Sequence, residues 1–474
     1  MQNDNSFFLV STFYNNALTA YVPQLWATES LMILQENMVA ASLVHRDFSQ
    51  VVADYGDTVN TRRPAKFLAI RKTADDSVTD QDAVATNVPV VLNQLVHVTF
   101  VIKDSQASLA FKDLVNEFLR PAMLAQAKFV DQAILCQYPQ FLANQYGQIG
   151  GLSSTTVRQY MLGTRQIMNQ NLAPEDGRNL LLSSVSETAM LNTDLFTQAQ
   201  MVGDGGNALR NAQLGTKLGF NNFMSQNVPN ISTAATNQVA GTGVTATSVF
   251  GVGATTITIS GLTAAIPAGS WCLIDSRPYR VVSSAGGATP TSVTIASPGL
   301  LASVAIGSSV VCYASTVTVQ STADSSTSGG YPLGYVKPIQ FTGLTNAPTP
   351  GQMVTFGTSS TSATYAILQY DPVAVTITLD RPLEAAVALS ATVNFGPAGQ
   401  FNLAFRENAI ALVSRPLAIP PEGIGARAAV VNYNNIAMRA VIGYDNVRQG
   451  VRVTLDMLFG VKVLDANLGA VMLG

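Results

Sequence analysis

Thr256-Ile-Thr-Ile-Ser-Gly-Leu-Thr263, followed by Pro267-Ala-Gly269, returns later in the chain as Pro338-Ile-Gln-Phe-Thr-Gly-Leu-Thr345, followed by Pro350-Gly351. The two glycines of the first copy are each 82 residues away from their counterparts in the second copy. Alternating Thr and Ile residues, bounded by Gly and Pro, are typical of short β-strands that end in turns. The repeat therefore predicts a β structure that occurs twice.

The correspondence continues beyond this pattern, because Val293-Thr-Ile-Ala-Ser-Pro298 matches Ile377-Thr-Leu-Asp-Arg-Pro382. Two copies are too few for a solenoid, which needs three or more repeats. We interpret residues 231–399 as an inserted all-β region of two tandem barrel-like modules, at about 231–325 and 326–399. Such modules hide their strand edges by closing on themselves.

The chain's 474 residues are unusually poor in charge, since charged residues make up 12% and hydrophobic residues 47%, with a mean hydropathy of +0.24. Low charge weakens the repulsion that keeps proteins apart, so we expect extensive self-association. The net charge of −3 argues against tight nucleic-acid binding, which requires clustered Lys and Arg.

The three cysteines, Cys136, Cys272 and Cys312, are odd in number and widely spaced. We expect buried reduced thiols, with a Cys272–Cys312 bridge inside the first β copy as an open alternative. The N-terminus lacks the basic region of a signal peptide, and no apolar run reaches the ~18 residues of a membrane span. These features predict a soluble protein, made in a cytoplasm and not inserted in a membrane.

Charges are arranged in a distinctive way along residues 55–104. Residues 55–72 alternate like a strand, and residues 96–103 form a second strand with Val96 and Phe100 on one face. We interpret the pair as a long hairpin with a basic limb and an acidic tip. Its candidate inter-subunit contact residues are Arg62, Arg63, Lys66, Arg71, Lys72, Asp75, Asp76, Asp80 and Asp82. Opposite charges on one arm would let copies dock head to tail.

The remaining sequence predicts one α/β domain interrupted by the β region. The longest helix candidate covers about 112–142, with Pro121 near the first turn of its longer part, where a missing N–H costs little. Its apolar face is formed by Met123, Ala127, Val130, Ile134 and Tyr138. Other expected elements are helices from residue 28, at 155–169 and at 186–191, strands at 179–183, 217–229 and 405–417, a hairpin of 436–444 with 451–457, and a last strand at 461–464.

Chemistry-bearing motifs are scarce. His45, expected on a helix, and His97, expected on a strand, have no Cys and carboxylate partners at metal-ligand spacing. Gly203-Asp-Gly-Gly-Asn-Ala208 fits a loose dinucleotide pattern, but no strand precedes it and no βαβ unit surrounds it. The aspartates of the hairpin tip are more typical of a solvated surface than of a Ca²⁺ site. We therefore expect no catalytic residue, cofactor or metal, and no enzymatic activity.

The order of elements, together with several short segments, resembles a known family. The segments are Gly56-Asp-Thr-Val-Asn-Thr-Arg-Arg-Pro64, Val96-His-Val-Thr-Phe-Val-Ile-Lys-Asp104, Phe118-Leu-Arg-Pro-Ala122, Gly219-Phe-Asn-Asn-Phe-Met-Ser-Gln-Asn-Val-Pro229 and Asn408-Ala-Ile-Ala-Leu-Val-Ser-Arg-Pro416. Residues 1–230 and 400–474 resemble the major capsid (coat) protein of tailed bacteriophages, with the Hong Kong ninety-seven (Johnson) fold. In particular, they resemble the coat proteins of short-tailed Salmonella phages, which carry an inserted β domain. This chain departs from simpler family members in the insertion, which has two β copies instead of one.

That resemblance implies a division of the chain into N-arm (1–54), extended loop (55–104), spine helix and peripheral region (105–154), first part of the axial domain (155–230) and returning axial and peripheral strands (400–474). It implies pentamers and hexamers of an icosahedral shell, assembled in the host cytoplasm and found in the virion. The implied partners are other copies of the chain, a scaffolding protein, a portal protein, decoration proteins and weakly held packaged double-stranded DNA.

Two other classes of function stay open at this point. An encapsulin-like shell protein would share the fold, although the large insertion is unusual there. A cell-surface or tail adhesin could use duplicated β modules to bind glycans, although the first half of the chain is helical and no export signal is seen. An enzyme of unrecognised type is the weakest alternative.

Overall fold

The fold of the chain is given by a computed structural model. It describes residues 29–30, 32–33, 38–46, 48, 56–63, 67, 69–72, 80–82, 86–103, 118–197, 211–212, 214–231, 237–239, 243–287, 289–320, 330–344, 346–421, 426–433, 435–447 and 450–474. Strands are many and helices few, in a mixed α/β architecture. Among the described helices, none has the length and apolar character needed to cross a membrane.

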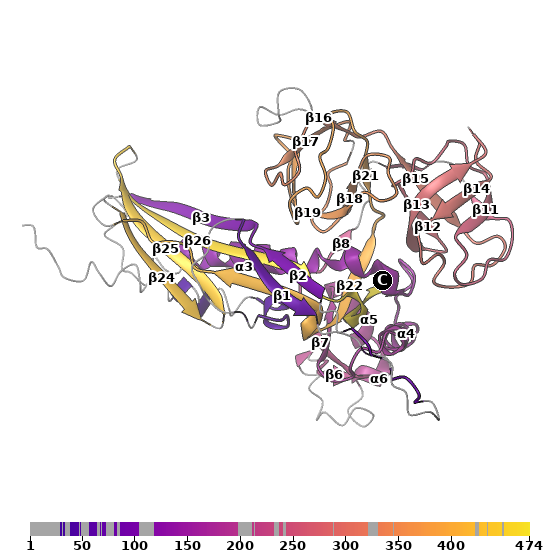
Figure 1. The fold of residues 1–474 in the computed structure, drawn as a ribbon, viewed down its shortest axis with the longest axis horizontal. Coiled ribbons are helices and arrows are strands. Elements are labelled where there is room, and N and C mark those ends of the chain that lie inside the picture. Colours follow the sequence, from indigo (N-terminus) through magenta and orange to yellow (C-terminus); the bar gives the residue numbers. More distant parts are fainter. Residues whose placement is uncertain are drawn as a thin grey trace, which may run out of the picture.

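A long antiparallel sheet forms a blade that projects from the body of the molecule (Figure 1). Its strands, in spatial order, are β23 (Ile410–Arg415), β26 (Gly450–Val463), β25 (Ile436–Asp445) and β24 (Ala426–Tyr433), with β3 (Gln94–Lys103) also paired to β26. The predicted hairpin of residues 436–444 and 451–457 is confirmed by β25 and β26. The strand expected at 461–464 is wrong, because those residues continue β26 and the last strand is β27 (Gly469–Leu473).

Helix α3 (Arg120–Leu135) packs against this sheet. Pro121 lies in its first turn, as predicted, and the 3₁₀ helix η5 (Tyr138–Asn144) follows it. All five residues of the predicted apolar face are at most 2% exposed. The single helix expected up to residue 142 is wrong, because α3 ends at Leu135 and Tyr138 lies in η5. Gln126 Nε2 donates to the Leu455 carbonyl of β26 at 2.7 Å. Each large apolar side chain buried between α3 and the sheet contributes about 1.5–3 kcal/mol to the stability of the fold.

A second, mixed sheet lies beside the base of the blade. Its order is β4 (Gln145–Tyr146), β27, β22 (Gly399–Arg406), β5 (Arg178–Leu182), β7 (Phe220–Met224) and β6 (Thr216–Lys217), with β8 (Asn230–Ile231) on β22. Helices α4 (Val157–Gln170), α5 (Ser184–Leu191) and α6 (Asp194–Thr197) accompany it. The predicted helices at 155–169 and 186–191 and the buried strand at 179–183 are confirmed.

Two other sequence predictions differ from this sheet. The strand expected at 217–229 is two short strands, β6 and β7, which turn at Gly219 with φ +85°. The strand expected at 405–417 is interrupted by the 3₁₀ helix η6 (Glu407–Ala409), so that the chain leaves β22 and enters the blade as β23. Local strand propensity could not reveal either change of direction.

The hairpin near the N-terminus has a different partner from the one expected. Strand β1 (Thr58–Arg63) pairs with β2 (Thr86–Val91), whereas β3, the expected returning limb, pairs over ten residues with β26. Both pairings satisfy strand alternation, and the face carrying Val96 and Phe100 packs on the main core as expected. The partner of β3 is more than 340 residues away in sequence, and local pattern alone does not specify such a pairing.

Two further sheets contain the repeated sequence, and we call them the first repeat and the second repeat. The first has the order β10-β11-β14-β13-β12-β15-β9, with β9 (Asn237–Val239), β10 (Thr245–Ala246), β11 (Thr256–Ser260), β12 (Trp271–Ile274), β13 (Arg277–Ala285), β14 (Ser292–Ile295) and β15 (Val310–Ser315). The second has the order β16-β17-β20-β19-β18-β21, with β16 (Thr318–Gln320), β17 (Ile339–Thr342), β18 (Met353–Phe356), β19 (Thr364–Asp371), β20 (Thr376–Leu379) and β21 (Val393–Phe395). Strands β10–β15 and β16–β21 thus follow one another in the same spatial order.

Each repeat also closes on itself through the same contact. A bridge between Thr245 and Ser309 joins β10 to the start of β15, and a bridge between Thr318 and Thr392 joins β16 to the start of β21. Each repeat encloses a hydrophobic core of its own. In Figure 1 the two repeats lie side by side above the body of the molecule.

The cysteine expectation is corrected within the first repeat. Cys272 on β12 and Cys312 on β15 are register partners with a Cα–Cα distance of 4.2 Å, and they form a disulfide. The expectation of reduced thiols at these two positions is wrong, and the alternative of a Cys272–Cys312 bridge is correct. The adjacent antiparallel strands bring together two residues that are 40 positions apart in sequence. Cys136 is a buried free thiol, as expected.

Candidate subunit-contact surfaces

The base of the β1–β2 hairpin is firmly attached to the blade. Val90 and Leu92 are fully buried against β23 and β26. A Cβ atom at Gly460 of β26 would lie 2.3 Å from the Val91 carbonyl oxygen, so only glycine permits this approach. Two backbone hydrogen bonds of 2.8 Å, from Gly56 to Leu92 and from Leu92 to Asp57, close the base.

The candidate contact residues lie along and beyond this hairpin. Arg62 and Arg63 are in β1, in register with Asn87 and Thr86. Arg71, Lys72, Asp80 and Asp82 are exposed, and Lys66, Asp75 and Asp76 lie outside the described residues. Their contact with a neighbouring subunit stays a prediction.

Two large apolar residues of the same segment were missed by the charge-based reasoning. Phe67 is 65% exposed and Ile70 is 56% exposed, next to the cations Arg71 and Lys72. Large exposed apolar side chains beside charges are typical of a protein–protein contact. The signal was present in the sequence, as Phe-Leu-Ala-Ile within a polar hairpin.

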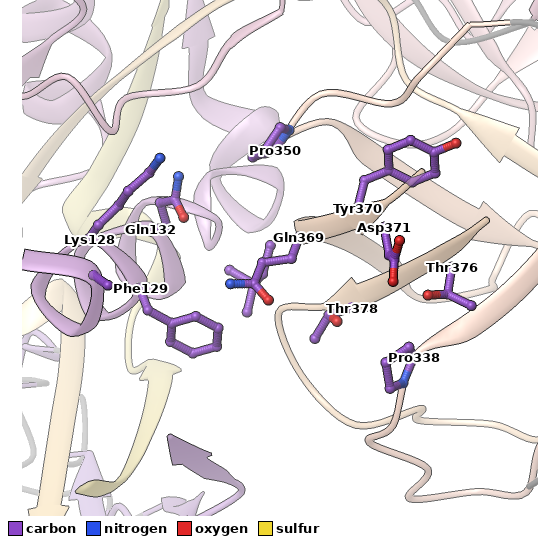
Figure 2. Close-up of a pocket in the computed structure, with 12 residues that line it drawn as sticks. Lys128, Phe129, Gln132, Pro338, Pro350, Gln369, Tyr370, Asp371, Thr376 and Thr378 are labelled. Atoms are coloured by element: carbon purple, nitrogen blue, oxygen red, sulfur yellow. The ribbon is translucent and has the colours of Figure 1, made fainter. Parts of the chain in front are cut away.

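A groove of about 520 Å³ separates α3 from the second repeat (Figure 2). Lys128, Phe129 and Gln132 of α3 line one side. Polar residues of the second repeat, including Gln369, Tyr370 and Asp371, line the other. The lining therefore combines apolar side chains with polar ones.

The second repeat is fixed to η5 and β3 by a buried polar cluster around Asp380. Its carboxylate accepts hydrogen bonds from the Ala366 N–H at 2.9 Å and from Gln137 Nε2 at 3.3 Å, and pairs with Arg381 at 2.8 Å. The Asp380 carbonyl accepts from Gln94 Nε2 at 2.8 Å. Burial raises the pKa of Asp380, and the positive charge of Arg381 opposes that increase.

A second buried carboxylate joins the N-terminal segment to α3. Asp131 accepts hydrogen bonds from the backbone N–H groups of Val39 at 3.0 Å and Ala41 at 3.2 Å, around the 3₁₀ helix η2 (Ala40–Ser42). Burial raises the pKa of Asp131, and these backbone hydrogen bonds partly offset the increase. Asp131 therefore fixes the segment around η2 to α3.

The two histidines have structural surroundings. His45 was expected on a helix, but it follows η2 and forms a β-bridge with Ala411 of β23. Its ring makes an edge-on contact with the Phe48 ring, with the ring centroids 5.1 Å apart. His97 lies on β3, as predicted, and is exposed. Within the described part of the chain, no group of three or more His, Cys, Asp and Glu side chains is placed to hold a metal ion.

Comparisons with known proteins give only distant structural neighbours. No model of a protein family matches the chain. No curated protein sequence matches it at a significant level. The solved structures that it resembles include a chain from Mycobacterium phage Che8, with a TM-score of 0.41 and 10% identity, covering 92% of this chain and 90% of that one. They also include the capsid of cyanophage P-SCSP1u, with a TM-score of 0.41 and 8% identity, covering 91% of each chain. A third is the mature capsid of bacteriophage PhiM1, with a TM-score of 0.39 and 8% identity, covering 89% of this chain and 82% of that one. These TM-scores are low, so the similarity does not by itself assign a fold family.

Proposed function

We propose that this chain is the major capsid protein of a tailed bacteriophage, and that copies of it assemble into the pentamers and hexamers of an icosahedral shell around phage DNA. The sequence resemblance to the coat-protein family supports this proposal. The observation that supports it most in the structure is the β1–β2 hairpin. Its base is buried on the blade, whereas Phe67, Ile70 and charges of both signs are exposed beyond it.

A two-stranded hairpin is marginally stable alone, so its outer part gains from lying on a neighbour. Exposed ion pairs contribute only about 0–1 kcal/mol each, and burial of an aromatic side chain contributes more. We therefore assign the contact energy chiefly to Phe67 and Ile70, and the direction of docking to the charged residues around them. Each copy would supply one arm and receive one, a heterologous contact that closes into rings.

The remaining parts of the proposal follow from the same assignment. Residues 231–399 are an insertion in the capsid fold, a scaffolding protein directs assembly, and a portal protein completes one vertex of the shell. The low net charge of −3 suits a container that must release its DNA. Decoration proteins would find their binding surface on the two repeats.

Negative-stain electron microscopy of the purified chain, alone and co-expressed with the products of neighbouring open reading frames, tests this function. We expect closed polyhedral particles, or tubes and spirals when scaffold is absent. The double substitution Phe67→Ser with Ile70→Ser should leave folded subunits that do not form particles. Deletion of residues 72–82 should have the same effect.

Val373→Ser is the matched control, because Val373 is 92% exposed in a turn of the second repeat, away from the hairpin. That variant should still form particles. A wild-type chain that stays a monomer or small oligomer under every condition would contradict the proposal, and glycan-binding assays would then test the adhesin alternative. Normal particles from the double variant would contradict the role of the hairpin.

A further inference from the structure

The two repeats can be superposed residue by residue from their strand registers. In the first repeat, Val281 of β13 pairs with Ile295 of β14, and the register shifts immediately after Val281. In the second repeat, Ile367 of β19 pairs with Leu379 of β20, and the same shift follows Ile367. The shared irregularity fixes the correspondence of these strands without any sequence alignment.

The residues next to these pairs differ between the repeats, because the first repeat lacks a carboxylate that the second repeat has. Ala296 of the first repeat is equivalent to Asp380 of the second, and Arg280 is equivalent to Ala366. The same backbone hydrogen bond of 2.9 Å joins each pair, from the N–H of Ala296 to Arg280 and from the N–H of Asp380 to Ala366. The first repeat therefore has a methyl group where the second has a buried carboxylate.

A cavity of about 170 Å³ lies where this carboxylate is missing, between the first repeat and η5. Ala296, Arg280, Trp271 and Gln145 are among its lining residues. Trp271 and Gln145 are 4% and 3% exposed. Trp271 Nε1, Arg280 Nε and Gln145 Oε1 are all buried without a hydrogen-bond partner among the described residues. Buried polar atoms without partners are uncommon and indicate a missing ligand or water.

The charge of Arg280 is also uncompensated. Its guanidinium donates to the carbonyls of Ser362 and Ser359 and to the Thr364 hydroxyl, all from the second repeat. No carboxylate pairs with it in the described part of the chain, and burial lowers its pKa. In the second repeat, by contrast, Asp380 pairs with Arg381. A half-buried cation that contacts only neutral acceptors is an attractive site for an anion.

We propose that this cavity binds a carboxylate group supplied from outside the repeat, which takes the place that the Asp380 carboxylate has in the sister repeat. Arg280 Nε and Trp271 Nε1 would donate to its oxygens, and a water beside it would donate to Gln145 Oε1. The cavity is well below the ~300–1,000 Å³ of sites for drug-sized ligands, so it accommodates a small carboxylate anion or one acidic side chain. The proposal does not depend on shell assembly.

Fluorine NMR of the chain labelled with 5-fluorotryptophan tests the proposal, because the sequence has two tryptophans. The Trp271 signal is assigned with Trp271→Phe. Addition of acetate, at ionic strength held constant with chloride, should shift the Trp271 signal in a saturable way. Equal shifts from chloride and acetate would overturn the proposal.

Ala296→Asp rebuilds the carboxylate of the sister repeat inside the first one. This variant should lower the apparent affinity for acetate at least about tenfold, with the Trp271 signal already displaced. Ser303→Asp, an exposed position of the same repeat, is the control and should keep the wild-type response. A wild-type response from Ala296→Asp would also overturn the proposal.

The same signal distinguishes the two sources of the carboxylate. If the source is a free anion, acetate shifts the signal of the unassembled chain. If the source is an acidic side chain of another copy, the signal moves on self-association without acetate, and Ala296→Asp prevents that movement. A signal that responds to neither acetate nor self-association would refute the site. Failure of particle formation alone would contradict the proposed function and leave the acetate result valid.

Discussion

Replacement of Asp380 by alanine tests how the second repeat is held on the rest of the chain. The variant leaves the Ala366 N–H and the Gln137 amide without their acceptor, in a place where the Asp380 side chain is 0% exposed. It also leaves Arg381, whose side chain is 14% exposed, without its buried carboxylate partner. Removal of one member of a buried ion pair typically costs about 3–5 kcal/mol.

Arg381 keeps two other acceptors, since it donates to Glu384 at 2.8 Å and to the Thr364 carbonyl at 2.7 Å. These contacts reduce the penalty, so we expect Asp380→Ala to lower the free energy of unfolding by about 3 kcal/mol. Asp380→Asn keeps an oxygen for the Ala366 N–H and should lower it by about 1–2 kcal/mol.

Urea unfolding followed by circular dichroism measures these differences. Glu384→Gln is the matched control, because Glu384 contacts the same guanidinium but its side chain is 50% exposed. That substitution should change the free energy of unfolding by less than about 1 kcal/mol. Equal effects of Asp380→Ala and Glu384→Gln would refute the reasoning, since they would mean that burial adds nothing to the ion pair.

Three more predictions concern other parts of the chain. Reduction of the Cys272–Cys312 disulfide, or Cys272→Ser, should lower the free energy of unfolding by about 2–4 kcal/mol, because the bond closes a loop of 40 residues. Urea unfolding with and without a phosphine reductant checks this prediction, and identical unfolding curves would contradict it. Gly163→Ala should lower the free energy of unfolding by about 1–3 kcal/mol although alanine favours helices, because the new Cβ would lie 2.2 Å from the Tyr146 ring. Thermal unfolding checks this prediction, and an unchanged melting temperature would show that the ring moves aside. The raised pKa of Asp131 means that its titration stabilises the fold below its unfolded-state pKa and that this stabilisation is lost as pH rises through the folded-state pKa. The stability advantage of the wild type over Asp131→Asn should therefore be larger near about pH 4.5 than near about pH 7.5, and the opposite trend in calorimetry would contradict the burial argument.

Local pattern determined a good part of this protein. The spacing of apolar residues and the position of Pro121 predicted α3 and its buried face, because both depend on contacts within a few turns of helix. The hairpin of β25 and β26 followed from two strand patterns around a short turn. The internal repeat was visible because the turns and buried positions of each copy recur at nearly constant spacing.

Tertiary structure decided the features that depend on distant partners. Strand β3 pairs with β26 and not with β1, because strand alternation specifies a buried face but not which of several strands covers the edge. Cys272 and Cys312 meet because β12 and β15 are neighbours in the sheet, which their spacing alone did not show. The difference between Ala296 and Asp380 was present in the sequence. The packing of the first repeat on η5 places a cavity beside Ala296 and Arg280, which has no carboxylate partner among the described residues. The sequence could not show this cavity, because its walls come from distant parts of the chain.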